Sequence, residues 1–395
     1  MSQLRLEPQS AFAIEDGRWD ALTRKIRSAG LPRRDLWLLP LIVLLTVLAL
    51  SLAAEIGARI GWPEQKRNSC AIPDPALGYR FKPNCTSVMK AAEGPWFTNS
   101  YNGCGYRSPQ SCGPVAPGTR RVALIGSSMS EGYLVPYPDT IGARLARDMT
   151  VQCRAPVEVQ NLGGLGYFAS DRLLRRFDEA LALHPGAVLL VVTPFDLQRG
   201  IEEDDPAQKQ KAASVSPLGT RARLFNTLKE SRAFVVAQHF HFQDMAVYLP
   251  LYLSYGDKAD FLRPPFTAAW QERLRRLDAA VREMSGRAHD AGASLVLAFV
   301  PQEAELALMA RGHLLPGVDP AALPRAVAAI AARHGANFVD TSAALKAQPQ
   351  PEKLYYQVDG HLSGAGQPLA AAPIAALFGS RIFSSCAAPH AGAPS

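Results

Sequence analysis

Residues 120–132 read RRVALIGSSMSEG, and this stretch decides the fold. The apolar run RRVALIG ends at a glycine, which is typical of a buried β-strand. A loop of small residues follows, and a helical pattern begins soon after it. A strand that turns directly into a helix lifts a loop hydroxyl to the sheet edge and points backbone N–H groups at it. Ser128 is therefore a candidate nucleophile, while a plain serine-glycine turn with an N-cap fits the same residues.

Strand and helix patterns alternate through the rest of residues 120–395. Apolar runs predict further strands near residues 157–163, 187–192, 294–301 and 337–340. Helical spacing predicts helices near residues 139–149, 169–183, 267–292, 323–335 and 363–379. This alternation is typical of a parallel sheet that helices cover on both faces.

Two further loops carry candidate functional residues. One follows the second predicted strand, where a parallel sheet binds its ligands, and the other precedes the last predicted helix. Residues 161–167, NLGGLGY, form a glycine-rich turn that permits close backbone approach and offers bare N–H donors. Near the C-terminus, His361 precedes a helix start, and Asp359 stands two residues before it. A carboxylate there orients the imidazole and fixes the tautomer that a general base needs. Each of these loops alone also fits an ordinary turn.

The order and spacing of the three loops resemble the SGNH (GDSL-type) hydrolase family over residues 120–380. The matching positions are Gly126, Ser128 and Gly132 in the first block, Asn161, Gly163 and Gly166 in the second, and Asp359 and His361 in the last. The resemblance implies a three-layer α/β/α, flavodoxin-like fold with a parallel sheet. It implies the catalytic residues Ser128, Asp359 and His361. The backbone N–H groups of Ser128 and Gly166 are then the oxyanion donors.

The loop TPFD after the third strand departs from the family pattern. Phe195 occupies the position of an asparagine that donates to the oxyanion, and the loss of one such donor typically costs about 10²–10³ in rate. Thr193 and Gln198 are candidates to replace it. We assign Phe195 and Asp196 to the substrate-binding surface and expect Phe195 to be buried under a lid. In the first block, Ser127 stands where the family usually has an aspartate.

Residues 36–54, LWLLPLIVLLTVLALSLAA, contain no charged side chain. A helix of about 20 such residues crosses a hydrocarbon core of about 30 Å, and a globular core helix would show a polar face. We therefore expect a transmembrane anchor. The positive-inside rule places residues 1–35 in the cytoplasm, because five basic residues precede the anchor: Arg24, Lys25, Arg27, Arg33 and Arg34. A cleaved signal peptide is the alternative, but its n-region would be unusually long.

This topology predicts a single-pass protein of the bacterial inner membrane whose catalytic domain is periplasmic. Residues 55–119, rich in proline, glycine, asparagine and cysteine, form an extracytoplasmic lead-in, and residues 120–395 form the hydrolase-like domain. Residues 200–265 interrupt the alternation with a polar loop and then an apolar, aromatic segment. We interpret this insertion as a helical lid. A membrane-resting or substrate-binding surface is the alternative.

All six cysteines follow the apolar segment, as an oxidising compartment such as a periplasm permits. We favour one of the fifteen possible connectivities. It pairs the cysteines that are close in sequence, Cys70–Cys85 and Cys104–Cys112, and leaves Cys153–Cys386 as the long-range pair. The sequence has no CxxC pair, so zinc binding has little support.

Composition and charge argue against several other classes of protein. With 48% hydrophobic and 19% charged residues, the chain is too apolar to be disordered. Its 42 Lys and Arg against 35 Asp and Glu give a formal charge of +7 without a basic block. Nucleic-acid binding, which needs clustered cations, therefore has little support. The sequence shows no glycine-rich phosphate loop and no metal-ligand signature, so we expect no cofactor and no metal.

The sequence thus predicts a membrane-anchored periplasmic serine esterase or deacetylase that acts through an acyl-enzyme on an O-acylated saccharide or lipid of the envelope. An O-acetyltransferase that modifies an envelope polysaccharide is an alternative, because a lid that excludes water favours a sugar hydroxyl as acceptor. A third possibility is a non-catalytic subunit of envelope assembly. It is suggested by Phe195, which stands where the family has an oxyanion donor. The expected partners are the acylated substrate, the inner membrane and envelope polysaccharide machinery.

Overall fold

The computed structural model describes residues 35–63, 69–90, 93–164, 170–198, 231–312, 315–383 and 386. Three predicted features lie outside the described residues: the cytoplasmic tail with its basic residues, the part of the glycine-rich turn that contains Gly166, and the polar part of the insertion. The chain divides into two compact units, Met1–Ala58 and Arg59–Ser395. The lead-in therefore belongs to the same unit as the predicted hydrolase domain.

Five parallel strands form the central sheet of the second unit, in the order β6-β5-β7-β8-β9. Their bounds are β5 Arg120–Ile125, β6 Val157–Asn161, β7 Ala187–Val192, β8 Ser294–Phe299 and β9 Asn337–Asp340. Each strand lies where the sequence predicts one. The strand order reverses between β5 and β7, and ligands of doubly wound sheets bind beyond the carboxyl ends of the strands at such a switch point.

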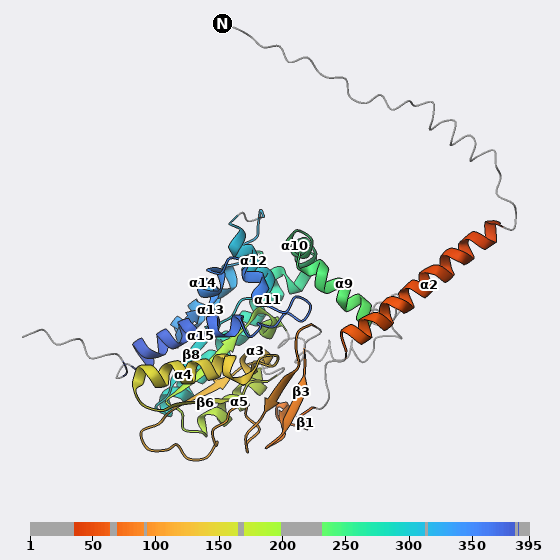
Figure 1. Ribbon diagram of the computed structural model, residues 1–395. Helices are drawn as coiled ribbons and strands as arrows, with labels where there is room; N and C mark the ends of the chain where they lie inside the picture. Colours follow the sequence, from red (N-terminus) through yellow and green to blue (C-terminus); the bar gives the residue numbers. More distant parts are fainter. Residues whose placement is uncertain are drawn as a thin grey trace, which may run out of the picture. The chain divides into compact units, whose positions relative to one another are not determined.

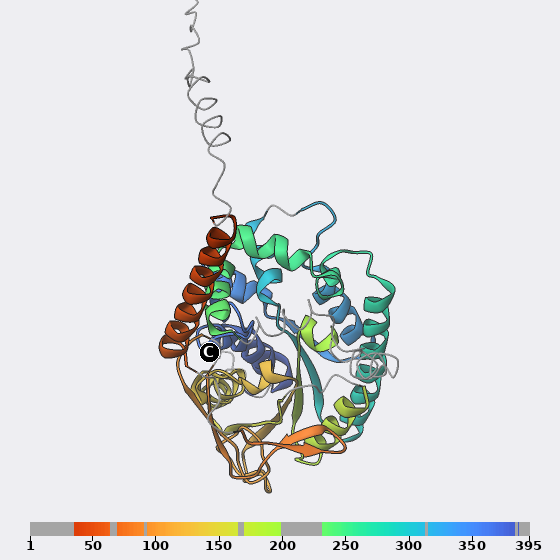
Figure 2. The same cartoon turned by 90° about the vertical axis from the view of Figure 1, so that its right-hand side faces the viewer.

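Helices cover both faces of the sheet, which two perpendicular views show (Figure 1 and Figure 2). One face carries α4 (Ile141–Cys153) and α15 (Gly366–Leu377), and the other carries α5 (Ser170–Leu181), α11 (Ala268–Asp290) and α13 (Ala322–Arg333). Successive side chains of a strand point to opposite faces. In β5, Val122 and Leu124 accordingly join the core under α4, and Ala123 and Ile125 join the core under α11.

The predicted buried face of the long amphipathic helix is confirmed, because Trp270 and Val281 of α11 are fully buried. The short helices α12 (Glu303–Arg311) and α14 (Ser342–Lys346) were not predicted. The first turn of α12 is polar, and its Gln302 and Glu305 form a capping box. Helices this short depend on tertiary packing rather than on a pattern that the sequence displays.

The lead-in forms two antiparallel hairpins, which the sequence does not predict. The pairs are β1 (Ala71–Asp74) with β2 (Gly78–Phe81), and β3 (Thr86–Met89) with β4 (Phe97–Ser100). Strands of four residues are too short to show a period. The disulfides join the expected partners: Cys70–Cys85, Cys104–Cys112 and Cys153–Cys386.

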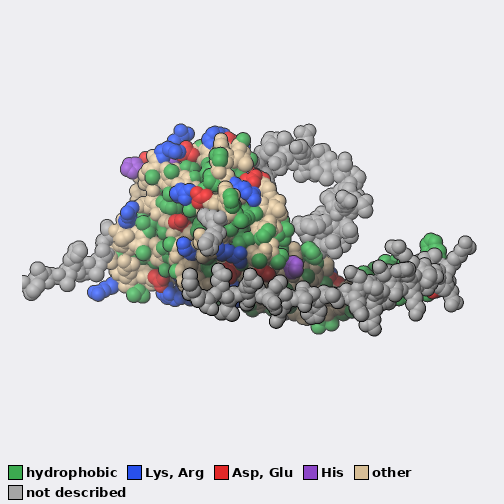
Figure 3. All heavy atoms as spheres, turned by 90° about the horizontal axis from the view of Figure 1, so that it is seen from above, with side chains coloured by type: hydrophobic (Ala, Val, Ile, Leu, Met, Phe, Trp, Pro, Cys, Tyr) green, Lys and Arg blue, Asp and Glu red, His purple; other side chains and the backbone are tan. Residues whose placement is uncertain are grey.

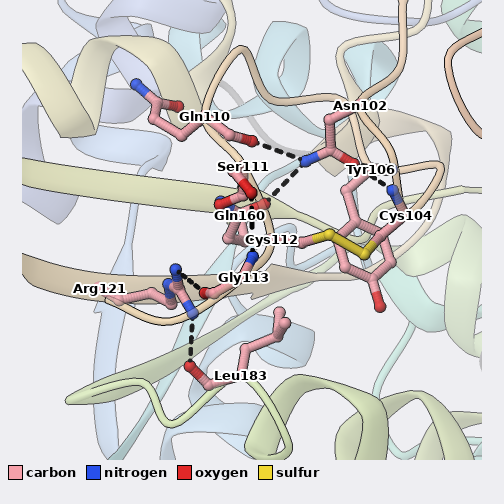
Figure 4. Close-up of a disulfide and its surroundings, with 10 residues drawn as sticks. All are labelled: Asn102, Cys104, Tyr106, Gln110, Ser111, Cys112, Gly113, Arg121, Gln160 and Leu183. Carbon is pink, nitrogen blue, oxygen red and sulfur yellow. Dashed lines mark hydrogen bonds between the residues drawn. A yellow bond between two sulfur atoms is a disulfide. The ribbon is translucent and has the colours of Figure 1, made fainter. Parts of the chain in front are cut away.

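The loop that Cys104–Cys112 closes is fastened to the first two strands of the sheet (Figure 4). Asn102 Nδ2 donates to Gln160 Oε1 of β6 at 3.0 Å, and Gln160 Nε2 donates to the Ser111 carbonyl at 2.9 Å. Arg121 of β5 donates to the Gly113 carbonyl at 2.7 Å. These bonds make the end of the lead-in part of the sheet's framework.

The N-terminal helix α2 runs from Asp35 to Gly61. Its segment Trp37–Gly61, with a mean hydropathy of 2.5, is long and apolar enough to cross a membrane. The predicted span ended at residue 54, where the charge-free stretch ends. The helix continues past Glu55 and Arg59, because a charged residue ends an apolar run without ending the backbone hydrogen bonding of a helix.

The apolar part of the insertion forms two helices, α9 (Arg232–Phe242) and α10 (Met245–Leu253). Ser231 and Asp244 cap their N-termini by accepting hydrogen bonds from backbone N–H groups. Phe242 and Tyr248 join the core on the α11 side of the sheet. The helical character of this segment is confirmed, and its role as a lid stays a prediction.

Charged side chains of both signs are interspersed on the face that Figure 3 shows. Surface helices also form ion pairs with one another, such as Arg287 with Asp178 at 2.6 Å and Arg333 with Asp278. Exposed pairs of this kind contribute at most about 1 kcal/mol each to stability. The two buried apolar cores, rather than the surface charges, therefore hold this unit together.

Candidate active site

The structure brings the three predicted catalytic side chains together. Ser128 Oγ lies 2.6 Å from His361 Nε2, and His361 Nδ1 is hydrogen-bonded to Asp359 Oδ1. In the neutral imidazole one nitrogen donates and the other accepts. The carboxylate can only accept, so Nδ1 donates to Asp359 and Nε2 accepts the hydroxyl proton of Ser128. This is the arrangement of a Ser-His-Asp triad.

Ser128 is held in a single helical turn, α3 (Ser128–Glu131), three residues beyond the end of β5. The Ser127 hydroxyl caps the turn by accepting from Met129 N, and Ser130 Oγ donates to the Ser127 carbonyl at 2.7 Å. Gly132 ends the turn in the left-handed conformation, with φ +71°, where a Cβ would meet Thr140. As the first residue of a helix, Ser128 has an N–H without an intrahelical acceptor. That N–H is available to an oxyanion.

Asn161 and the glycines after it fasten the nucleophile turn to the end of β6. Asn161 Nδ2 donates to the Ser130 carbonyl at 2.9 Å, and its Oδ1 accepts from Gly163 N at 2.9 Å. A Cβ on Gly163 would lie 2.5 Å from Glu131 N, which explains the glycine. Within the described part of the turn, the second block acts as a scaffold. The oxyanion role of Gly166 stays a prediction.

A buried arginine from the lead-in supports the other end of α3. Arg107, 1% exposed, donates to the carbonyls of Glu131 and Gly132 and, at 2.5 Å, of Val135. Tyr101 donates to Glu131 Oε1 at 2.6 Å. Burial lowers the pKa of Arg107, and the negative charge of Glu131 opposes that shift. Sequence reasoning missed this support, because nothing in the lead-in marks a contact with a loop twenty or more residues away.

Asp359 and His361 lie on a short loop that a bridge between Tyr355 and Leu362 closes. Tyr356 N donates to the His361 carbonyl at 2.9 Å, and Gly360 N donates to the Tyr356 carbonyl at 2.7 Å. Gly360 has φ +82°, a conformation that favours glycine. This tight turn brings the Asp359 carboxylate to the imidazole of His361, although only Gly360 lies between the two residues.

The electrostatic environment of His361 favours its protonated form. Burial alone lowers the pKa of His361, but the charge of Asp359 and its hydrogen bond raise the pKa, with smaller contributions from Glu131 and Asp196. The net shift is upward. The Tyr133 ring lies 5.7 Å from the imidazole, centroid to centroid, and covers part of it. An imidazole supported in this way can hold the proton that it takes from Ser128.

The TPFD loop forms a helix cap. Thr193 Oγ1 accepts from Asp196 N at 3.2 Å, and Asp196 Oδ2 accepts from Thr193 N at 2.9 Å and from Thr193 Oγ1 at 2.7 Å. This reciprocal pattern is a capping box for the helical residues 194–198. The Thr193 hydroxyl proton is therefore engaged with Asp196, and Thr193 does not replace the missing oxyanion donor.

Asp196 is 3% exposed, and its carboxyl group holds the loop together. The pKa of Asp196 is raised to about 6 because the group is buried. Hydrogen bonds from Ser127 and Thr193 and the positive charge of His361 oppose this shift. The bond to Ser127 explains the serine where the family usually has aspartate, because a second carboxylate there would repel the first. Direct contact of Asp196 with a substrate stays a prediction.

Phe195 is 41% exposed, so the expectation that it is buried is wrong. The capping box accounts for this, because it turns the carboxyl of Asp196 inward while the preceding residue lies on the outer side of the first helical turn. The assignment of Phe195 to a substrate-binding surface stays a prediction. Gln198, the other candidate for a replacement donor, is 5% exposed.

Within the described residues, no group of three or more His, Cys, Asp or Glu side chains is placed to hold a metal ion.

Comparison with known families agrees with this geometry. Residues 124–369, more than half of the chain, match the GDSL-like Lipase/Acylhydrolase family. The chain belongs to this family. The match spans the Ser128 turn and the loop of Asp359 and His361, and this GDSL-like hydrolase is therefore an SGNH-type enzyme that acts on ester bonds. The lead-in and α2 lie outside the match.

Solved structures similar to this GDSL-like hydrolase include a lipase/acylhydrolase from Enterococcus faecalis, with 15% identity over 66% of this chain and 96% of that chain and a TM-score of 0.37. They also include a catalytic mutant of an acetylxylan esterase from Geobacillus stearothermophilus, with 15% identity over 69% of this chain and 97% of that chain and a TM-score of 0.39. A comparison with curated proteins gives no match.

Proposed function

We propose that this GDSL-like hydrolase is a membrane-anchored periplasmic serine esterase or deacetylase that acts on an O-acylated saccharide or lipid of the cell envelope. The observation that supports it most is the 2.6 Å contact between Ser128 Oγ and His361 Nε2, with Asp359 on the other nitrogen. A non-catalytic subunit has no need of a nucleophile, a base and an orienting carboxylate in line.

The reaction begins when Ser128 Oγ bonds to the ester carbonyl carbon and its proton passes to His361 Nε2. The Ser128 N–H stabilises the negative charge on the carbonyl oxygen, with Gly166 as the second predicted donor. The carbon–oxygen bond to the alcohol then breaks, and His361 returns the proton to the leaving alcohol. Water attacks the acyl-enzyme in the same manner, releases the acid and restores the Ser128 hydroxyl.

Two observations support the location. α2 is long and apolar enough to cross a membrane, and all six cysteines form disulfides after it in the sequence. Disulfides persist in oxidising compartments such as the bacterial periplasm. An esterase held at the outer face of an inner membrane meets the acylated glycans and lipids of the envelope, which is why we propose these as its substrates.

The test uses the full chain in detergent micelles. Acetate release is measured from p-nitrophenyl acetate and from O-acetylated oligosaccharides, with and without an unacetylated oligosaccharide as acceptor. The proposal expects free acetate in both conditions, together with fluorophosphonate labelling. If the acetyl group instead appears on the added oligosaccharide, the enzyme is a transferase. If no probe labels the protein, the catalytic proposal is wrong.

A further inference from the structure

Glu93 connects the lead-in to the loop that carries the acid and the base of the triad. It lies between β3 and β4, outside the family match. Glu93 Oε1 accepts from Val358 N at 2.9 Å, and the backbone N–H of Asp359 also bonds to this carboxyl group. The residue is 4% exposed. One buried carboxylate therefore holds two successive backbone donors, the second of which belongs to Asp359.

The other carboxylate oxygen of Glu93 faces α9. His239 Nδ1 lies 3.8 Å from Glu93 Oε2. His239 Nε2 lies 2.7 Å from the amide nitrogen of Gln243, which can only donate, so Nε2 accepts and Nδ1 carries the proton. The Trp62 ring packs edge-on against the imidazole at 5.0 Å between centroids. Glu93 thus lies between the triad loop and the first helix of the insertion.

We propose that Glu93 is a positioning residue of the triad: through the backbone of residues 358 and 359 it aims the Asp359 carboxylate at His361. This inference rests on the proposed function. The Asp359 side chain is 25% exposed and the turn beside it is a glycine in the left-handed conformation. A side chain that is not enclosed by packing takes its direction from its backbone, and Glu93 fixes that backbone.

The charge environment argues against a purely structural role. Burial raises the pKa of Glu93, the Val358 N–H lowers it, and the Asp359 charge raises it again. Among the described residues, four titratable groups lie near this carboxyl group: Asp359, His239, Glu303 and Tyr356. Two of them are acids, and an apolar or amide side chain would be more favourable there for stability alone. The positioning role requires an acceptor oxygen at the backbone of residues 358 and 359, and Glu93 Oε1 is that acceptor.

The experiment compares Glu93→Ala, Glu93→Gln and the control Glu305→Gln in the full chain. Glu305 is a fully buried acid on α12 whose carboxylate caps its own helix, so it matches Glu93 in burial but not in contacts. The first readout is kcat and KM for p-nitrophenyl acetate across pH. The second is the pKa of His361 by NMR titration, with its signal assigned from a His361→Gln sample.

Glu93→Ala should lower kcat by about 10–100-fold with KM nearly unchanged, because a catalytic group displaced by about 1 Å costs about 10²-fold. It should also lower the pKa of His361, because Asp359 no longer lies against the imidazole. Glu93→Gln keeps an acceptor for the Val358 N–H and should restore most of both values. Glu305→Gln should change neither. If Glu93→Ala does not fold, Glu93→Asp, whose acceptor is one methylene shorter, should give intermediate values of both readouts.

A folded Glu93→Ala protein with the wild-type kcat and the wild-type His361 pKa would overturn the proposal. Equal losses of kcat in the alanine and glutamine variants, with an unmoved His361 pKa, would overturn it too and leave Glu93 a stabilising residue. The NMR readout needs no turnover. A wild-type chain without esterase activity therefore contradicts the proposed function. The pKa of His361 in the Glu93 variants would still test whether Glu93 positions the triad.

Discussion

Ser128 Oγ and His361 Nε2 lie 2.6 Å apart although the two residues are separated by 233 positions in the chain. The side chain of Gln367, at the start of α15, links the elements that carry them. Its Nε2 donates to the Met129 carbonyl at 3.0 Å, and its Oε1 accepts from Ile141 N at 2.9 Å. The nucleophile turn, the start of α4 and the helix after the base are thereby joined through one buried amide.

The first prediction follows from that amide. Gln367→Leu keeps the side-chain volume but leaves the Ile141 N–H buried without a partner. It also removes the hydrogen bond of Gln367 to the Met129 carbonyl, which then keeps only the bond from Gly132 N at 3.3 Å. A buried unpaired group costs about 1–3 kcal/mol and a lost hydrogen bond about 1 kcal/mol, so we expect the free energy of unfolding to fall by about 2–4 kcal/mol. Chemical denaturation measures this. The control Gln271→Leu, at an exposed position on α11, should stay within about 0.5 kcal/mol of wild type. Equal losses in the free energy of unfolding for the two variants would show that Gln367 does not link the nucleophile turn to α4 and α15.

Labelling distinguishes the nucleophile from the two other serines of the nucleophile turn. Ser128→Ala should abolish reaction with fluorophosphonate probes while the fold survives. Ser127→Ala and Ser130→Ala should keep the labelling, because these hydroxyls cap the turn and bond to its backbone. Each should cost about 1 kcal/mol of stability. A loss of labelling on Ser130→Ala with labelling intact on Ser128→Ala would identify a different nucleophile.

The pH dependence follows from the raised pKa of His361. The imidazole must be neutral to accept the Ser128 proton, so kcat/KM should fall as the pH drops through a midpoint above the usual value of 6.5. Asp359→Asn removes the carboxylate that raises this pKa. The midpoint should move to lower pH, and kcat should fall by up to about 10⁴ as in other Ser-His-Asp triads. An unchanged midpoint in Asp359→Asn would contradict this assignment.

The titration of His361 should also make the folding stability depend on pH. Because the pKa of His361 is raised in the folded state, its stabilising contribution is present below the unfolded pKa and is lost as the pH rises through the folded pKa. Asp359→Asn should remove this contribution. Denaturation in acidic and in slightly alkaline buffer measures the difference, which should be smaller in the variant.

Phe195→Asn tests the missing oxyanion donor. A well-aimed carboxamide is worth about 3–4 kcal/mol of transition-state stabilisation. Because Phe195 is partly exposed, its removal should cost less than about 1 kcal/mol of stability. We expect equal or higher esterase turnover, and no gain from Phe195→Ala, which supplies no donor. A clear loss of turnover in folded Phe195→Asn would show that the ring shapes the substrate site.

Topology is tested with a reporter that is active only in the periplasm. Fused after residue 60 it should be active, and fused after residue 30 it should be inactive, because the basic residues before the apolar segment keep that end in the cytoplasm. The reverse pattern would overturn the proposed location.

The parallel strands and the three candidate catalytic residues were predictable because their signals are local. Each strand is one apolar run. Ser128 follows such a run, and Asp359 and His361 precede the start of the last helix. Arg107 and Glu93 were not predictable from the sequence, since each acts through backbone groups of a segment far along the chain. The burial of Phe195 was predicted wrongly because an aromatic side chain after a strand suggests packing, and the capping box that turns it outward depends on hydrogen bonds that a pattern does not reveal.

In the proposed reaction, Ser128 carries the acyl group. The direct measurement is mass spectrometry of the full chain after rapid acid quench from p-nitrophenyl acetate, with the protein digested to locate the modification. We expect one added acetyl group on the peptide that contains Ser128, and none in Ser128→Ala. An acetyl group on another residue, or no acetylated peptide while p-nitrophenol is released, would contradict it.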